Sequence, residues 1–296
     1  MKSSLNKMFE INLCGVKLRN PFILASGILG VGAPLLKRVY SKGAGAVTTK
    51  SIGPVERIGN KNPSVIEADN GLMNCVGLPT PGFLNMKDEF EELMASKVPV
   101  IYSVYGSSIE DYVKIVEFIQ KFKPALIELN ISCPNKAEGM LFAQDKDLAY
   151  DLVKKVRAVS KIPIIAKLTP NCKDIVEIAI ACEKAGADAI TAINTVLIKD
   201  KDLSMGQGGL SGPAIHSTAI EAVSKIHKAV KIPIIGIGGV NNGKEALDMI
   251  KAGATAVGIG SGVYYRGIEI FSEILEELKK ELGGKSVEEM IGYDNK

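Results

Sequence analysis

The sequence has no Trp, only 5% aromatic residues and two His among 296 residues. His216 and His227 lie on one segment, and neither has the spacing of a catalytic triad or a metal site. The five Cys form no Cys-x-x-Cys pair, which argues against a zinc ribbon or iron–sulfur cluster within the chain. No apolar run is long enough to span a membrane, and the N-terminus has no apolar core for secretion. We therefore expect neither a metal site nor a membrane segment.

Other classes of function are also disfavoured. Lys and Arg total 36 against 33 Asp and Glu, and the net charge of +3 is spread over helical patterns. This pattern is typical of solvated helix faces and not of a nucleic-acid surface. No Gly-x-Gly-x-x-Gly follows any expected strand, so a dinucleotide-binding sheet is disfavoured. An odd number of Cys without a secretion signal fits a reducing cytoplasm.

A repeat of short apolar runs and amphipathic helical stretches dominates the chain. Continuous apolar strands that alternate with helices predict a parallel sheet covered on both faces, and eight such units predict a closed (β/α)8 barrel, a TIM barrel. We therefore expect one α/β domain over 1–296, with a small N-terminal hairpin over Phe9–Leu18. The eight expected strands are Pro21–Ser26, Ala46–Lys50, Val98–Val104, Leu126–Ser132, Pro163–Thr169, Ala189–Thr195, Pro233–Gly239 and Ala256–Ser261. The clearest helical patterns are Leu84–Ala95, Asp111–Phe122, Asp147–Ser160, Lys173–Ala185, Ala214–Ala229 and Lys244–Ala252.

One connection is much longer than the others. The stretch from Ser51 to Gly82 is rich in Gly, Pro and Asn, and it leaves the C-terminal end of the second strand. Long loops in compact domains are usually functional, and barrel active sites are built at this end. We expect the part around Asn74–Pro79 to fold over the site as a long loop.

The segment Glu128–Asn135 carries the most chemistry. Asn130 and Asn135 offer amide donors and acceptors, and Cys133 between them can exchange one proton. A thiol at the barrel rim fits proton abstraction from a ring carbon. The alternative is a buried Cys with Asn residues in turns. Cys172, after the fifth strand, is the second candidate thiol.

Glycines follow the last two expected strands, where barrels often bind a phosphate through backbone N–H groups. Gly238 and Gly239 end the seventh strand, and Gly260 with Ser261 end the eighth. A further run, Gly208–Gly212, can add a third edge to the same site. Tight turns are the alternative interpretation.

Two lysines lie in apolar strands, Lys50 at the end of the second and Lys167 within the fifth. A buried Lys is costly unless an anion balances it. A flavin fits because its reduction builds negative charge that a Lys stabilises. Schiff-base chemistry and a structural ion pair remain as alternatives.

Asn194 and Thr195 end the sixth strand and add polar groups to the same rim. With Asn74, Asn130 and Asn135 they form a set suited to alternating C=O and N–H groups, as in a pyrimidine. Turn and helix-cap roles are the alternative for each Asn.

These motifs together resemble a known family. NISCPN, NCVGLP, AKLTPN, AINT, GGLSGPA, IPIIGIGGV and GIGSG, in this order and spacing, resemble the dihydroorotate dehydrogenases, flavoproteins of pyrimidine biosynthesis. Cys in NISCPN is similar to the soluble class 1 enzymes, and the ending Ser286–Gly292 looks most like class 1B. The resemblance covers about Asn20 to the end of the chain.

The resemblance implies oxidation of dihydroorotate to orotate by FMN. Cys133 would be the catalytic base that removes the C5 proton, while hydride passes from C6 to FMN. The implied substrate-binding residues are Lys50, Asn74, Val76, Gly77, Leu78, Asn130, Asn135, Asn194 and Thr195. The implied FMN-binding residues are Ala25, Ser26, Gly27, Lys50, Ser51, Asn130, Lys167, Gly212, Gly238, Gly239, Gly260 and Ser261.

The resemblance also implies partners: a homodimer, and for class 1B a second subunit that carries FAD and a 2Fe-2S cluster and reduces NAD. Two departures from the family pattern affect the loop, since Thr80 and Cys75 stand where Asn and Ser are usual. Two alternative functions remain. One is a reductase like dihydropyrimidine dehydrogenase, although Leu141–Asp145 lacks the Cys expected there. The other is a non-redox phosphate-binding lyase or isomerase.

Overall fold

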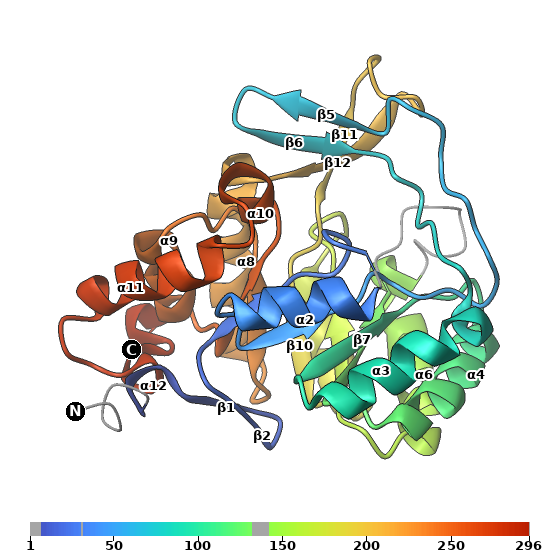
Figure 1. The fold of residues 1–296 in the computed structure, drawn as a ribbon, viewed down its shortest axis with the longest axis horizontal. Helices are drawn as coiled ribbons and strands as arrows, with labels where there is room; N and C mark the ends of the chain where they lie inside the picture. Colours follow the sequence, from blue (N-terminus) through green and yellow to red (C-terminus); the bar gives the residue numbers. More distant parts are fainter. Residues whose placement is uncertain (1–6, 31, 132–141, 296) are drawn as a thin grey trace.

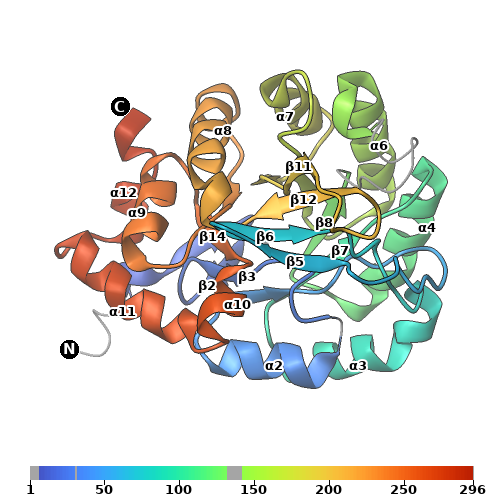
Figure 2. The same ribbon diagram turned by 90° about the horizontal axis from the view of Figure 1, so that it is seen from above.

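A closed barrel of eight parallel strands forms the centre of the protein, as the sequence predicts (Figures 1 and 2). The computed structural model describes residues 7–30, 32–131 and 142–295. Around the barrel the strands follow the order β10-β13-β14-β3-β4-β7-β8-β9, and this closes the sheet without a free edge. The barrel strands are β3 (Phe22–Leu24), β4 (Ala46–Thr48), β7 (Val100–Val104), β8 (Leu126–Asn130), β9 (Ile164–Lys167), β10 (Ala189–Ala192), β13 (Ile234–Ile237) and β14 (Ala256–Ile259).

Helices cover the outside of the barrel and bury one apolar face each. In α9, for example, Ala246 and Ile250 are fully buried, and the Asn242 side chain caps the first turn by accepting from the Glu245 N–H. The predicted helices are confirmed to within a few residues. The described helices around the barrel are α2 (Ala33–Ser41), α3 (Lys87–Ser96), α4 (Ile109–Ile119), α6 (Lys146–Val159), α7 (Ile175–Lys184), α8 (His216–Ala229), α9 (Gly243–Lys251), α10 (Gly262–Arg266), α11 (Ile270–Leu282) and α12 (Val287–Met290).

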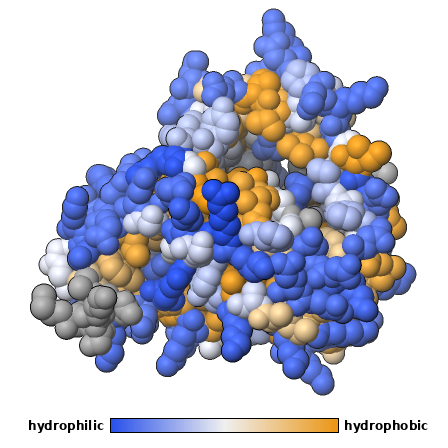
Figure 3. All heavy atoms as spheres, viewed as in Figure 1, coloured by the Kyte–Doolittle hydropathy of each residue, from blue (hydrophilic) through white to orange (hydrophobic). Residues whose placement is uncertain are grey.

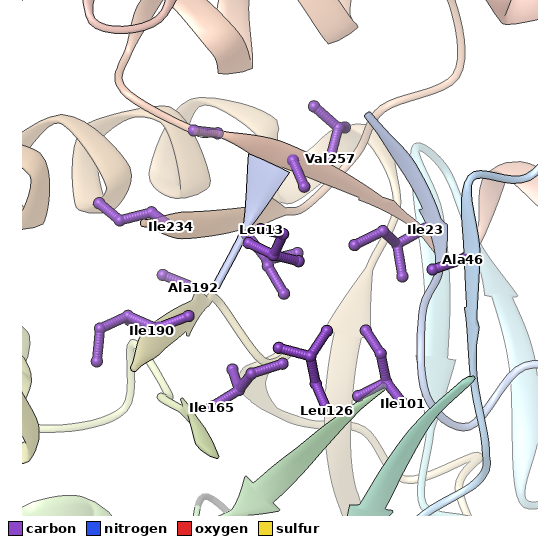
Figure 4. Close-up of a cluster of buried hydrophobic side chains, with 14 of the residues drawn as sticks. Leu13, Ile23, Ala46, Ile101, Leu126, Ile165, Ile190, Ala192, Ile234 and Val257 are labelled. Atoms are coloured by element: carbon purple, nitrogen blue, oxygen red, sulfur yellow. The ribbon is translucent and has the colours of Figure 1, made fainter. Parts of the chain in front are cut away.

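The lower part of the barrel is filled by aliphatic side chains (Figure 4). Ile101, Leu126 and Ile165 from neighbouring strands are at most 2% exposed. The predicted N-terminal hairpin is present as β1 (Ile11–Leu13) and β2 (Val16–Leu18), and its Leu13 lies among these side chains with no exposed surface. The hairpin therefore closes the end of the barrel opposite the C-terminal ends of the strands.

A second sheet overhangs the C-terminal ends of the barrel strands (Figures 1 and 2). Its four antiparallel strands are ordered β11-β12-β6-β5, with β5 at Val65–Ala68, β6 at Gly71–Asn74, β11 at Val196–Lys199 and β12 at Gln207–Ser211. The predicted long excursion after β4 is present, and residues 65–74 within it form the hairpin of β5 and β6, which the sequence pattern did not reveal. The two hairpins follow β4 and β10, whose C-terminal ends meet at one rim.

The overhanging sheet also corrects the interpretation of the Gly208–Gly212 run. Gly208 and Gly209 lie within β12, and not in a phosphate-binding turn. A β-carbon on Gly209 would lie 2.0 Å from Thr195 Oγ1, and one on Gly208 would lie 2.3 Å from the Asn74 carbonyl oxygen. These two glycines therefore allow close packing between the sheet and the barrel rim, and Gly212 alone remains available to a ligand.

No helix among the described residues is both long and apolar enough to cross a membrane. The exposed surface carries charged side chains on most helices, and Figure 3 shows apolar side chains gathered in the hollow between the overhanging sheet and the barrel. This hollow lies above the C-terminal ends of the barrel strands, where the sequence predicts the site.

Candidate active site

A chain of hydrogen-bonded hydroxyl groups crosses the mouth of the barrel. The Oγ atoms of Ser26 and Ser51 are 3.3 Å apart, and those of Ser51 and Ser103 are 3.0 Å apart. Ser103 donates to Glu128 Oε1 at 2.9 Å, and Asn130 Nδ2 donates to Ser51 Oγ at 3.1 Å. Ser26, Ser51 and Asn130 were all predicted as site residues, and the fold brings them into one network.

Glu128 is the anion of this network and balances a predicted cofactor lysine. Lys167 Nζ lies 3.9 Å from Glu128 Oε1, and the side chains of both are less than 8% exposed. Thr191 donates to the other carboxylate oxygen at 3.1 Å. The ion pair that the sequence analysis considered for Lys167 is therefore present, and its anion is the Glu128 carboxylate.

Lys50 shares the mouth without a carboxylate of its own. It forms no ion pair among the described residues, and both burial and the charge of Lys167 lower the pKa of its ammonium group. Within the part of the chain that the structure describes, two ammonium groups and one carboxylate leave this part of the mouth with an excess of positive charge. Such a site favours an anionic ligand.

The glycine turns after β13 and β14 lie beside Gly212. A β-carbon on Gly239 would lie 2.7 Å from the Gly212 carbonyl oxygen, and one on Gly212 would lie 3.6 Å from Ser261 Oγ. A β-carbon on Gly260 would lie 3.7 Å from that of Ala25. Gly238 packs against α8 with φ at 146°, where few side chains are tolerated. Three of the predicted phosphate residues, Gly212, Gly239 and Ser261, are thus brought together into one backbone cradle.

Two buried polar atoms beside this cradle have no hydrogen-bond partner among the described residues: His216 Nε2 and Asn241 Oδ1. The Nδ1 atom of His216 lies 2.8 Å from the Gly238 carbonyl oxygen, and Asn241 Nδ2 donates to the Gly239 carbonyl at 3.3 Å. Buried polar groups rarely stay unpaired. Asn241 Oδ1 is an acceptor, and so is His216 Nε2 when the Nδ1–H donates to the Gly238 carbonyl, so both atoms fit donor groups of a ligand, such as hydroxyls, and not phosphate oxygens. The sequence patterns set His216 aside and did not point to Asn241.

The loop after β6 forms the wall under the overhanging sheet. Asn74 Nδ2 donates to the Gly209 carbonyl at 3.2 Å, and the Leu78 carbonyl accepts from the Tyr105 hydroxyl at 3.2 Å. The Asn60 N–H donates to the Val76 carbonyl, and the Asn60 amide packs so closely on Gly77 that a β-carbon there would clash. The predicted substrate residues of this loop are held in fixed positions.

Thr80 and Cys75, the two departures in this loop, are accommodated locally. Thr80 Oγ1 accepts from the N–H groups of Gly53 at 3.3 Å and Gly82 at 3.2 Å. Cys75 Sγ lies 3.4 Å from Ser204 Oγ in the neighbouring hairpin. Both side chains support the loop, and neither position disturbs the barrel rim.

Asn194 and Thr195 lie where β10 leaves the barrel, as predicted. The Asn194 N–H donates to the Leu168 carbonyl, and Asn194 Oδ1 accepts from the Thr195 N–H.

Asn171 is a further residue of this rim that the sequence patterns did not single out, although it lies in the motif AKLTPN. Its amide donates to Thr169 Oγ1 at 2.8 Å and the Thr195 carbonyl at 2.9 Å, and it accepts from the Leu197 N–H at 2.8 Å.

Several predicted residues fall elsewhere. Cys133 and Asn135 lie outside the described residues. Gly27 is exposed, and no atom of the described residues lies within 4 Å of where its β-carbon would lie. Cys172, the second candidate thiol, donates to the Thr169 carbonyl at 3.3 Å, and burial together with Asp174 raises its pKa. A raised pKa disfavours the thiolate, which makes Cys172 a poor base.

Glu128, Ser103 and Thr191 are the main site residues that the sequence reasoning did not select. Each lies within an apolar barrel strand and is 3% exposed or less. A charged or hydroxyl side chain at an inward strand position is the signal that could have identified them. Applied to Lys167, the same signal succeeded.

The fold and the mouth together define a (β/α)8 barrel whose mouth carries the positive charges of Lys50 and Lys167 beside a group of glycine turns. A family model described as dihydroorotate dehydrogenase matches residues 8–282. The chain belongs to the dihydroorotate dehydrogenase family, an oxidoreductase family of pyrimidine biosynthesis, and this confirms the predicted function and enzyme class.

Curated relatives identify the branch of the family. The chain is 44% identical to a dihydroorotate dehydrogenase B (NAD(+)), catalytic subunit, of Methanocaldococcus jannaschii, over 96% of this chain and 97% of the relative. It is 43% identical to the protein of the same name from Pyrococcus abyssi, over 96% of this chain and 98% of that one. The expected similarity to class 1B is confirmed.

A solved structure supports the fold independently. The crystal structure of DHODH from Eimeria tenella in complex with ferulenol superimposes with a TM-score of 0.87 at 21% identity, over 98% of this chain and 89% of that one. At this identity the likeness concerns the fold alone. It confirms the predicted TIM barrel.

Proposed function

We propose that this chain, as one FMN-binding barrel domain over 1–296, oxidises (S)-dihydroorotate to orotate in the synthesis of UMP. The observation that carries the proposal is that one site offers a partner for each end of a ligand. Two ammonium groups lie at the barrel mouth, and a glycine cradle lies beside it. The lysines suit a pyrimidine edge that gains negative charge, and the cradle suits a phosphate.

The residues around the mouth fit FMN in particular. Gly212, Gly239 and Ser261 would hold its phosphate, and the unpaired Asn241 Oδ1 and His216 Nε2 beside them would meet hydrogen-bonding groups of the ligand. Lys167 would face the pyrimidine edge of the ring. Bound there, FMN would supply the hydride-accepting atom of the reaction.

Substrate oxidation needs a base as well as a hydride acceptor. Cys133 follows β8 directly after the described part, and we assign it the C5 proton of dihydroorotate on the basis of its family motif. Lys50, Asn130 and Asn194 would orient the substrate ring and its carboxylate. Of these, Lys50 supplies the positive charge, and burial together with the charge of Lys167 lowers the pKa of its ammonium group.

Reduction of NAD would need a partner that takes the electrons from this chain, whereas fumarate or a quinone could accept them directly. Among the described residues there is no cluster of three or more metal-ligating side chains, and the sequence has no dinucleotide motif. The relatives are named as NAD(+)-linked catalytic subunits, which supports a partner subunit with FAD and a 2Fe-2S cluster. We further propose a homodimer in the cytoplasm.

Purified apoprotein reconstituted with FMN tests the proposal. We expect about one bound flavin per chain and loss of its visible absorbance on anaerobic addition of dihydroorotate. Dihydrouracil, which lacks the carboxylate that Lys50 would bind, should reduce the flavin far more slowly than dihydroorotate. A folded protein without a flavin spectrum would favour the lyase alternative, and equal rates with dihydrouracil would favour the reductase.

A further inference from the structure

We propose that Glu128 is a positioning residue: its carboxylate holds the Lys167 ammonium at the barrel mouth and sets the direction of the hydroxyl chain that orients Asn130. The role deepens the proposed function, on which it rests, because Lys167 is the group assigned to the flavin. Glu128 itself would touch neither cofactor nor substrate.

The first support is that the Glu128 carboxylate is buried and that hydrogen-bond donors and a cation surround it. The residue is 3% exposed, and three side chains from other barrel strands surround its carboxylate: Ser103 from β7, Lys167 from β9 and Thr191 from β10. A buried carboxylate is retained only where donors and a cation compensate it. Here the only cation at ion-pair distance among the described residues is Lys167.

The second support is the direction of hydrogen bonding. A carboxylate accepts and does not donate, so Ser103 must direct its hydroxyl proton to Glu128. The Ser103 oxygen is then left to accept from Ser51, at 3.0 Å, and Ser51 in turn accepts from Asn130 Nδ2. The negative charge of Glu128 thus determines that the Asn130 side chain presents its Nδ2 group, and not its Oδ1 atom, to the Ser51 hydroxyl.

The third support is the balance of charge. Lys50 and Lys167 repel each other, and the pKa of Lys50 is lowered partly for this reason. Of the two lysines, Lys167 is the one that has a carboxylate of the described part beside it, at 3.9 Å. The ion pair therefore keeps one ammonium in a fixed place, while Lys50 stays available to a second anion.

A double-mutant cycle tests this role in the full chain. The variants are Glu128→Gln, Lys167→Met and the pair combined, with Thr191→Val as a milder variant that removes one donor to Glu128 without changing charge. Three quantities are measured: urea unfolding of the apoprotein, FMN affinity by quenching of flavin fluorescence, and affinity of the bound flavin for sulfite. Sulfite addition places negative charge on the flavin edge that Lys167 would face.

We expect Glu128→Gln and Lys167→Met each to weaken sulfite binding about tenfold, the scale of one hydrogen bond to a charged group. The double variant should match Lys167→Met, because Glu128 acts through that lysine. Thr191→Val should lie between the wild type and Glu128→Gln. If Glu128→Gln fails to fold, this graded effect of Thr191→Val still carries the test.

Other outcomes would overturn the proposal. Sulfite affinity that is unchanged or increased in Glu128→Gln, with lower unfolding stability alone, would mean a purely structural carboxylate. A double variant that loses about a hundredfold, the product of the two single losses, would mean independent roles. A wild type without bound flavin would remove the proposed function, and the unfolding cycle of the apoprotein would still show whether Glu128 and Lys167 are coupled.

Discussion

Gly239 lies directly against the backbone of Gly212: a β-carbon on Gly239 would be 2.7 Å from the Gly212 carbonyl oxygen. Gly239 adopts φ of 67°, and Gly212 adopts φ of 92°. Both turns are therefore shaped for glycine, one after β13 and one after β12. Their contact joins the barrel strands to the overhanging sheet at the proposed phosphate site.

Gly239→Ala should damage this cradle selectively. The new methyl group meets Gly212 and His216 at less than 3 Å, and the positive φ adds strain. We expect at least a tenfold loss of FMN affinity in fluorescence titration and about 1–3 kcal/mol of stability. Gly283→Ala is the matched control, because Gly283 also has a positive φ but its added β-carbon would meet no atom of the described chain within 4 Å. A similar loss of FMN affinity in both variants would contradict the cradle.

Lys50→Met should raise the KM for dihydroorotate by at least tenfold and leave FMN affinity much less affected. Lys50 is assigned to the anionic substrate, and hydrogen bonds to charged groups contribute about 1.5–3 kcal/mol. Steady-state kinetics with a dye acceptor measure the change. Lys42→Met, at an exposed ion pair with Glu269, is the control and should leave KM unchanged.

The lowered pKa of Lys50 also predicts a pH dependence. Its ammonium form is lost at a lower pH than for an ordinary Lys, so wild-type KM should rise on the alkaline side before other lysines titrate. In the apoprotein the unfolded state binds more protons in that window, so stability should rise with pH there. Lys50→Met should abolish both the pH dependence of KM and that of stability. If both pH dependences in Lys50→Met equal those of the wild type, another group causes them.

The barrel was predictable because its signals are periodic and local. Runs such as Ile234–Ile237 are continuously apolar, and helices such as α9 carry one apolar face with a capping Asn242. The overhanging sheet escaped prediction because β5 and β11 are short and half exposed, and Gly208 and Gly209 read as loop. Each of these strands pairs with the next strand along the chain, but the two hairpins join into one sheet through β12 and β6, whose residues are more than a hundred positions apart, such as Gly209 and Asn74.

The site was predictable where a motif or a costly residue signalled it. Lys167 stood out as a charge in an apolar strand, and the glycine turns stood out by position. Glu128 carries the same signal two residues before Asn130, but its meaning depends on Ser103 and Thr191 in other strands. Which side chains meet across a barrel follows from strand register, and a single sequence does not show register.

Asn171→Ala should weaken substrate binding by displacing the segment that follows β10 at the barrel rim. The Asn171 amide joins Thr169 to Thr195 and to Leu197, so its loss loosens the start of the β11 hairpin. We expect KM for dihydroorotate to rise about fivefold and stability to fall about 1 kcal/mol, as for the loss of a few half-buried hydrogen bonds. Asn85→Ala, which removes one exposed bond to the Pro81 carbonyl, is the control. An unchanged KM would separate this loop from substrate binding.

Cys133→Ala should leave FMN and orotate binding intact and nearly abolish flavin reduction by dihydroorotate. A positioned base contributes on the order of 10²–10⁴-fold, and the thiolate is the competent form of this one. The wild-type rate of reduction should therefore rise with pH through a thiol-like value, and Cys133→Ser should be slow but improve at high pH. Anaerobic stopped-flow measurements of flavin absorbance give these rates. Cys172→Ala is the matched control and should reduce its flavin at nearly the wild-type rate, because the Cys172 thiol donates to the Thr169 carbonyl and its pKa is raised. Loss of activity in Cys172→Ala with activity retained in Cys133→Ala would move the base to the rim after β9.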